Sequence, residues 1–168
     1  MSAFDFCIEV ILAEEGGLVT YPSDPGGTTK YGISQRAYPA LNIRSITLDD
    51  AKALYKRDYW LLIHGDELPP GLALLMLDSA VNQGTGTAIR LLQEAANARL
   101  DGVMGGMTIS AAQQQMPGIM TRFAALRAWR YEINRNEEVF GKGWFQRLFR
   151  VYTAGLTMYH ARRGGVPG

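Results

Sequence analysis

Two carboxyl groups near the start of the chain are suited by type and surroundings to acid–base chemistry on a glycosidic bond. Glu15 closes a run with helical periodicity, in which Phe4, Ile8 and Ile11 fall on one face. A carboxyl group at the end of this apolar face is expected to be partly desolvated, which favours its protonated form near neutral pH. Glu14 points further round the helix towards solvent, so Glu15 is the better candidate for a general acid.

The segment after Glu15 supplies the second carboxyl group. Asp24 stands among turn-forming residues and is expected to stay ionised, and Thr29 follows it. Glycosidic cleavage uses such a pair, because one carboxyl group protonates the leaving oxygen while the other stabilises charge or directs water at the anomeric carbon. In the alternative interpretation, Glu15 only ends a helix and Asp24 braces the loop through backbone hydrogen bonds.

Helical periodicity dominates the elements that must position these residues. Helices are expected over residues 3–15, 47–62, 70–82, 89–96, 108–116, 118–136 and 144–161, with a short one near 34–38. The arginines of the last two helices are expected on their outer faces. Strand character is confined to residues 18–33, which predicts a loop or small hairpin after the first helix. The predicted fold class is therefore mainly α.

Composition is typical of one ordinary globular domain, because 47% of the 168 residues are hydrophobic and 20% are charged. The single cysteine excludes an intramolecular disulfide, and two histidines argue against a dedicated metal site, so neither metal nor cofactor is expected. No apolar run is long enough to insert in a membrane. The N-terminal segment lacks an early positive charge, so we expect synthesis in the cytoplasm without a signal peptide.

Charge is divided unevenly along the chain. Residues 1–84 carry a net charge of −5 and residues 85–168 carry +6. Such asymmetry favours an anionic partner such as a cell envelope, a membrane surface or nucleic acid, although solvated helix faces explain single arginines equally well. Acidic residues interrupt the C-terminal arginines, and no recognised DNA-binding motif is present, so nucleic acid is not the expected partner.

The segment 15–33 resembles the signature of glycoside hydrolase family 108, a lysozyme-like group of N-acetylmuramidases found among phage endolysins and bacterial secretion-activator proteins. The matching positions are Glu15, Gly16, Gly17, Asp24, Gly26, Gly27, Thr29, Gly32 and Ile33. Leu18 stands where the family usually has an aromatic residue. The resemblance implies a lysozyme-like fold with Glu15 as the catalytic acid and with supporting roles for Asp24 and Thr29.

Residues 59–60 and 78–84 are similar to the mid-chain signature of the same family. Asn82 either contacts an N-acetyl or hydroxyl group of a sugar or caps the end of its helix. Tyr59 is the better candidate to stack on a sugar ring, whereas Trp60 is expected in the core. The other candidate substrate-binding residues lie in the first loop: Gly27, Tyr31 and Gly32.

Residues 92–93 and 101–108 resemble the predicted peptidoglycan domain that usually accompanies this catalytic region. The Asp-Gly-rich turn at 101–106 either contacts peptidoglycan or makes a tight connection between helices. We therefore expect a catalytic region over residues 1–90 and a helical, predicted peptidoglycan-binding region over 91–168, packed as one compact unit.

The resemblance implies a peptidoglycan hydrolase that cleaves the β-1,4 bond between N-acetylmuramic acid and N-acetylglucosamine. The alternatives are a non-catalytic peptidoglycan-binding protein and a lytic transglycosylase. A monomer is expected to reach the cell wall in the periplasm with help from a holin or an export system. Its role is then either phage or prophage lysis or local wall opening for secretion.

Overall fold

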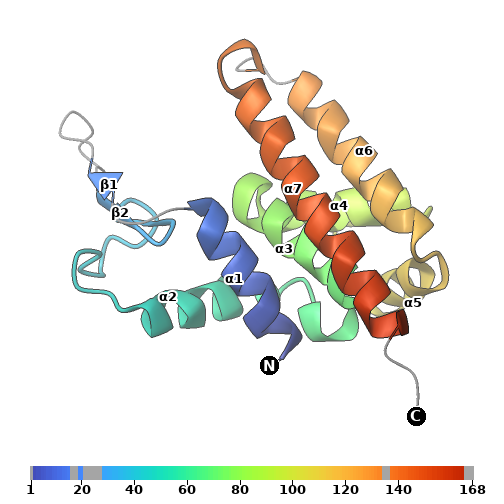
Figure 1. Ribbon diagram of the computed structural model, residues 1–168, viewed down its shortest axis with the longest axis horizontal. Coiled ribbons are helices and arrows are strands. Elements are labelled where there is room, and N and C mark those ends of the chain that lie inside the picture. The colour runs from blue at the N-terminus through green and yellow to red at the C-terminus, as the bar shows by residue number, and fades with distance from the viewer. Residues whose placement is uncertain (1, 16–18, 21–27, 134–136, 165–168) are drawn as a thin grey trace. The chain divides into compact units, whose positions relative to one another are not determined.

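The computed structural model describes residues 2–15, 19–20, 28–133 and 137–164. This part is mainly α-helical with one small antiparallel sheet (Figure 1), which confirms the predicted fold class. Residue contacts divide the chain into two compact units, Met1–Asp58 and Tyr59–Gly168. Residue 90, the expected end of the catalytic region, lies in α4 (Thr85–Ala95), which packs on α3 (Pro70–Gln83) in the second unit.

The first unit begins with α1 (Ala3–Glu15), the predicted amphipathic helix. Ser2 and Asp5 cap its start reciprocally, since each backbone N–H donates to the side chain of the other residue. One stripe of α1 is buried and consists of Phe4, Cys7, Ile8 and Ile11. The apolar face predicted from the sequence is therefore the buried face.

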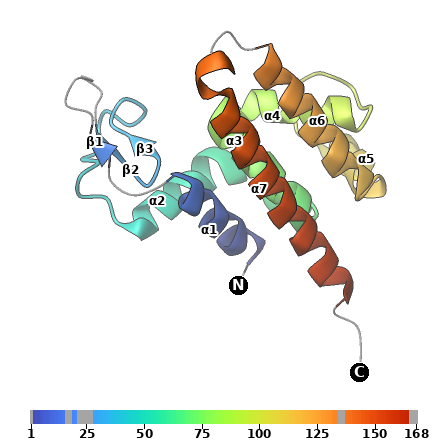
Figure 2. The same ribbon diagram turned by 45° about the horizontal axis from the view of Figure 1, so that its top comes forward.

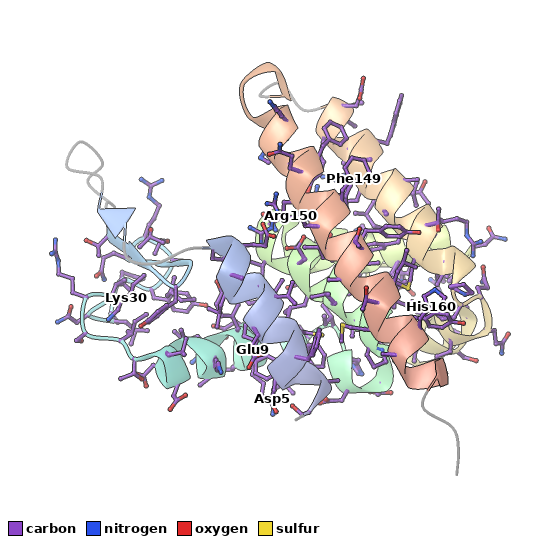
Figure 3. All side chains as sticks on the ribbon, viewed as in Figure 1. Asp5, Glu9, Lys30, Phe149, Arg150 and His160 are labelled. Atoms are coloured by element: carbon purple, nitrogen blue, oxygen red, sulfur yellow. The ribbon has the colours of Figure 1, made fainter. Side chains whose placement is uncertain are left out.

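A small sheet follows α1 in the order β1 (Val19–Thr20), β2 (Thr28–Lys30) and β3 (Ile33–Ser34). Both pairings are antiparallel. The Lys30 ammonium group, labelled in Figure 3, donates hydrogen bonds to the carbonyl oxygens of Arg44 (3.1 Å) and Ile46 (2.8 Å). This side chain ties the loop after the sheet to β2.

The prediction of a short helix near residues 34–38 is wrong. Ser34 belongs to β3, and the Gln35 side-chain amide donates hydrogen bonds to three backbone carbonyl oxygens, of Tyr38, Pro39 and Leu41. These bonds satisfy carbonyl groups that a helix would otherwise pair internally, so the segment forms a side-chain-stabilised turn.

The helix α2 (Leu48–Tyr55) starts at a capping box formed by Thr47 and Asp50, as the sequence predicts. It ends earlier than expected, because residues Lys56–Trp60 form a π-helical turn instead of continuing the α-helix to 62.

In the second unit Trp60 is fully buried, in agreement with its expected core position. Gly65 lies against its indole ring, where a β-carbon would clash.

The second unit is built around α3, in which every residue from Gly71 to Ala80 is buried. Against it pack α4, α6 (Gly118–Glu132) and α7 (Glu137–Gly164), while α5 (Gly106–Gln114) contacts α4 (Figures 1 and 2). The backbones of α3 and α7 touch where Gly71 meets Gly155. Within the described residues, no helix has the length and hydropathy needed to cross a bilayer.

Candidate active site

Glu15 is the last residue of α1 and follows Ile8 and Ile11 along the buried stripe. Its side chain is half-buried, which agrees with the partial desolvation expected at the end of an apolar face. Glu14 is also half-buried. Exposure therefore does not distinguish the two carboxyl groups, contrary to the expectation that Glu14 lies nearer to solvent.

The turn between β2 and β3 lies directly against Glu15. A β-carbon at Gly32 would stand 2.8 Å from Cγ of Glu15 and 3.0 Å from its Cβ, so only glycine fits at this distance. Tyr31 and Gly32 both have left-handed backbone conformations, with φ of 54° and 77°. The turn thus brings two predicted substrate-binding residues to the predicted catalytic acid.

Tyr55, the last residue of α2, holds the same turn. Its hydroxyl group donates a hydrogen bond of 3.0 Å to the Tyr31 carbonyl oxygen, and its side chain is 1% exposed. A β-carbon at Gly32 would also clash with Oη of Tyr55. Sequence reasoning did not single out Tyr55, because a tyrosine on the inner face of an amphipathic helix is typical of a core residue.

The sheet fixes Thr29, the third predicted catalytic residue. Thr29 is the central residue of β2, where it pairs with Val19 of β1 and Ser34 of β3, and it is half-buried. The other two predictions in this loop, Asp24 as second carboxyl group and Gly27 as substrate-binding residue, lie outside the described residues.

The remaining predicted substrate-binding residues, Tyr59 and Asn82, belong to the second compact unit. Tyr59 is half-buried in the π-helical turn, and Asn82 is exposed near the end of α3. The Asn82 amide nitrogen donates to the Asp78 backbone oxygen (2.8 Å) and to Asp78 Oδ1 (3.3 Å). Asn82 therefore bonds back to the previous turn of its own helix and does not cap the helix end.

A buried charge cluster lies beneath Asn82. The fully buried Asp78 pairs with Arg127 of α6 through a 2.5 Å contact and with Arg147 of α7, whose Nε donates to Asp78 Oδ1 at 2.8 Å. Arg127 is itself 0% exposed. The expectation that the arginines of the last two helices lie on outer faces is wrong for these two, because Asp78 on α3 provides their counter-charge inside the unit.

An aromatic group covers the Arg127 side of this cluster. The Arg127 guanidinium carbon lies 5.7 Å from the centroid of the Tyr131 ring, a cation–π arrangement. Tyr131 in turn packs against Trp144 and edge-on against Phe145. Burial raises the pKa of the Tyr131 hydroxyl group, so this side chain stays neutral around the cluster.

The Asp-Gly-rich turn is closed by its own side chains. The Gln93 amide donates to Asp101 Oδ1 (2.7 Å) and to the Val103 carbonyl oxygen, and Gln93 Oε1 accepts from the Gly102 N–H (2.9 Å). These hydrogen bonds join α4 to the turn before α5. Of the two roles considered for this motif, the bonds establish the structural connection between helices.

Among the described residues, no three histidine, cysteine, aspartate or glutamate side chains gather closely enough to hold a metal ion. The first unit instead assembles a half-buried carboxyl group, a left-handed turn pressed against it and a buried tyrosine that holds the turn. This arrangement suits acid catalysis by a positioned side chain.

A mainly α-helical fold with a glutamate at the end of its first helix, before a small sheet, is consistent with a lysozyme-like fold. Residues 8–84 match the model of the family described as glycosyl hydrolase 108. The chain therefore carries a glycosyl hydrolase 108 region, which confirms the resemblance found in the sequence. This region spans the boundary between the compact units and includes Glu15, Tyr55 and Asn82.

Among solved structures, the chain is similar to that of Brucella abortus SagA, with 29% sequence identity and a TM-score of 0.83. The similarity covers 93% of this chain and 95% of that chain. No curated protein matches the chain. Together, the family region and this nearly full-length similarity support the role of a peptidoglycan hydrolase of the lysozyme-like kind.

Proposed function

We propose that the protein is an N-acetylmuramidase that hydrolyses the β-1,4 bond between N-acetylmuramic acid and N-acetylglucosamine, with Glu15 as the general acid. One observation carries this proposal: within the family region, the Glu15 side chain ends α1 and lies against the Tyr31–Gly32 turn. A fixed carboxyl group beside a closely approaching backbone is what protonation of a glycosidic oxygen requires.

In the proposed reaction Glu15 donates its proton to the glycosidic oxygen as the bond to the anomeric carbon breaks. Asp24, as a carboxylate, stabilises the positive charge that develops on the sugar or orients the attacking water. Thr29 supports the same step through its hydroxyl group. The water oxygen then bonds to the anomeric carbon and gives its proton to one of the two carboxylates, Glu15 or Asp24, which completes hydrolysis.

Substrate binding is proposed for two groups of residues. In the first unit, Gly27, Tyr31 and Gly32 provide backbone that can approach a sugar chain closely. In the second unit, Tyr59 provides an aromatic face for a sugar ring, and Asn82 provides an exposed amide. The two hydrogen bonds from its nitrogen to Asp78 leave the Asn82 carbonyl oxygen as the group that accepts a bond from an N-acetyl N–H.

We also propose that the enzyme acts on the wall in the periplasm after assisted release from the cytoplasm by a holin or an export system. Lysis by a phage or prophage and local wall opening for secretion use the same reaction. Expression in the cytoplasm with and without a co-expressed holin separates the delivery routes, because holin-dependent lysis supports the first role.

The test of the proposed chemistry compares wild type with Glu15→Gln on purified peptidoglycan, with the released fragments identified by mass spectrometry. Glutamine is nearly isosteric with glutamate and cannot donate the proton, so turnover should be lost while the fold persists. Glu14→Gln is the matched control, since it makes the same change one residue earlier in a side chain of similar exposure, and it should retain activity.

Fragments with reducing muramic-acid ends from wild type alone support the proposal. Anhydro-muramic ends would make the enzyme a lytic transglycosylase, in which the sugar's own hydroxyl group replaces water. Wall binding without fragments from either protein would replace the proposal with a non-catalytic binding role. An active Glu15→Gln enzyme together with an inactive Glu14→Gln enzyme would assign the acid to Glu14.

A further inference from the structure

Tyr55 occupies an unusual place for a core tyrosine, because its hydroxyl group meets the backbone beside the proposed acid. The side chain is 1% exposed, and Oη donates to the Tyr31 carbonyl oxygen at 3.0 Å. A buried hydroxyl group needs a hydrogen-bond partner, and here that partner belongs to the β2–β3 turn, 24 residues earlier in the chain. Packing alone would be served equally well by phenylalanine.

The turn that Tyr55 holds has a conformation that requires support. Tyr31 has φ of 54°, and a bulky residue seldom adopts this left-handed conformation unless its surroundings impose it. Gly32 follows with φ of 77°. The Tyr55 hydrogen bond to the Tyr31 carbonyl fixes the peptide group between these two residues.

The same turn limits where the Glu15 side chain can lie. From the ideal β-carbon position of Gly32, both Oη of Tyr55 and Cγ of Glu15 lie within 3.0 Å. The Tyr55 hydroxyl group and the Glu15 side chain thus converge on the same face of Gly32, at the place where a β-carbon would stand. A movement of the turn away from Tyr55 changes the space open to Glu15.

We propose that Tyr55 is a positioning residue for the catalytic acid: through its hydrogen bond to Tyr31 it holds the Tyr31–Gly32 turn against Glu15 and so fixes the direction of the carboxyl group. The proposal rests on the proposed function, since it assigns no chemical step to Tyr55. It explains why a hydroxyl group is buried at this end of α2.

The first test is Tyr55→Phe, which removes the hydrogen bond and keeps the ring. We expect kcat on solubilised glycan strands to fall about tenfold, because small misplacements of a catalytic group slow the chemical step, while KM stays within about twofold. Tyr38→Phe is the matched control in the same unit, since it removes a tyrosine hydrogen bond of 2.6 Å to Asp58 and should leave both constants unchanged.

The second test combines Tyr55→Phe with Gly32→Ala. A methyl group at position 32 clashes with Oη of Tyr55, and removal of that oxygen makes room for it. The double variant should therefore lose less activity than the product of the two single losses predicts. Thermal unfolding of all variants by circular dichroism separates lost activity from lost fold.

The proposal is overturned if Tyr55→Phe keeps the wild-type kcat, or if it loses activity only in proportion to a loss of folded protein. Strict multiplication of the two single effects would also overturn it. Its failure is distinguishable from failure of the proposed function. An inactive Glu15→Gln beside a fully active Tyr55→Phe removes only the positioning role, whereas an active Glu15→Gln removes the acid itself.

Discussion

Gly32 lies so close to Glu15 that a β-carbon at position 32 would stand 2.8 Å from Cγ of the glutamate side chain. The two residues come from different elements, the end of α1 and the β2–β3 turn. Two features therefore require a glycine at position 32: the left-handed φ of 77° and the lack of room for any side chain.

Gly32→Ala is accordingly expected to reduce both stability and activity. The left-handed conformation costs an alanine about 1–2 kcal/mol, and the displaced Glu15 side chain lowers kcat in addition. Denaturant unfolding and rates on peptidoglycan measure the two effects separately. Gly86→Ala is the control, because an added β-carbon there meets no atom within 4 Å and the backbone is not left-handed. Equal stability of the two variants would contradict the prediction.

Asn82→Ala should weaken substrate binding more than it slows the chemical step. Loss of one hydrogen bond to a sugar N-acetyl group costs about 1 kcal/mol, which corresponds to a rise in KM of about fivefold at unchanged kcat. Kinetics on solubilised glycan strands provide the measurement. Gln114→Ala removes another exposed amide of the second unit and should leave KM as in wild type. A fall in kcat alone would place Asn82 in the chemical step instead.

The first helix and the half-buried position of Glu15 at its end could be predicted from the sequence because the relevant information is local. Phe4, Ile8 and Ile11 recur at helical spacing, and Glu15 completes the same face, so the buried stripe and the half-buried carboxyl group both follow from periodicity. The catalytic role of Glu15 rests on the resemblance to the family signature and stays a prediction. The Thr47–Asp50 capping box was predictable for the same local reason.

The support around Glu15 could not be predicted, because it depends on contacts between segments distant in the chain. The pattern that places Tyr55 inside α2 does not tell which backbone oxygen its hydroxyl group reaches. The sequence predicts Arg127 on an outer helix face, because it does not show that Asp78 of another helix is its buried partner. The predicted helix at 34–38 failed because the Gln35 amide satisfies the local carbonyl groups instead.

Tyr38→Phe should raise the pKa of Asp58. In the folded protein, hydrogen bonds from Arg57 and then from Tyr38 stabilise the carboxylate and hold that pKa below its ordinary value, against the opposing effect of partial burial. Such a group contributes stability above its unfolded pKa, and the contribution is lost as the pH falls through the folded pKa. An NMR titration of the Asp58 carboxyl carbon in both proteins tests this, and identical titration curves would contradict it.

In the buried charge cluster, Asp78→Asn should destabilise the fold more than Arg127→Met does. Asp78→Asn leaves Arg127 and Arg147 without their shared counter-charge inside the second unit, and breaking a buried pair in this way costs about 3–5 kcal/mol. Arg127→Met should cost less, because Asp78 keeps its hydrogen bond from Arg147.

Urea unfolding of the two variants, followed by tryptophan fluorescence, measures this order. Arg130→Met provides the control on the same helix, since Arg130 is exposed and its replacement should change the free energy of unfolding by no more than about 0.5 kcal/mol. If Arg127→Met proves more destabilising than Asp78→Asn, packing of the Arg127 side chain against Tyr131 outweighs its charge. In that case Asp78 acts mainly as a hydrogen-bond acceptor for Asn82, a role that asparagine at position 78 also fulfils through its carbonyl oxygen.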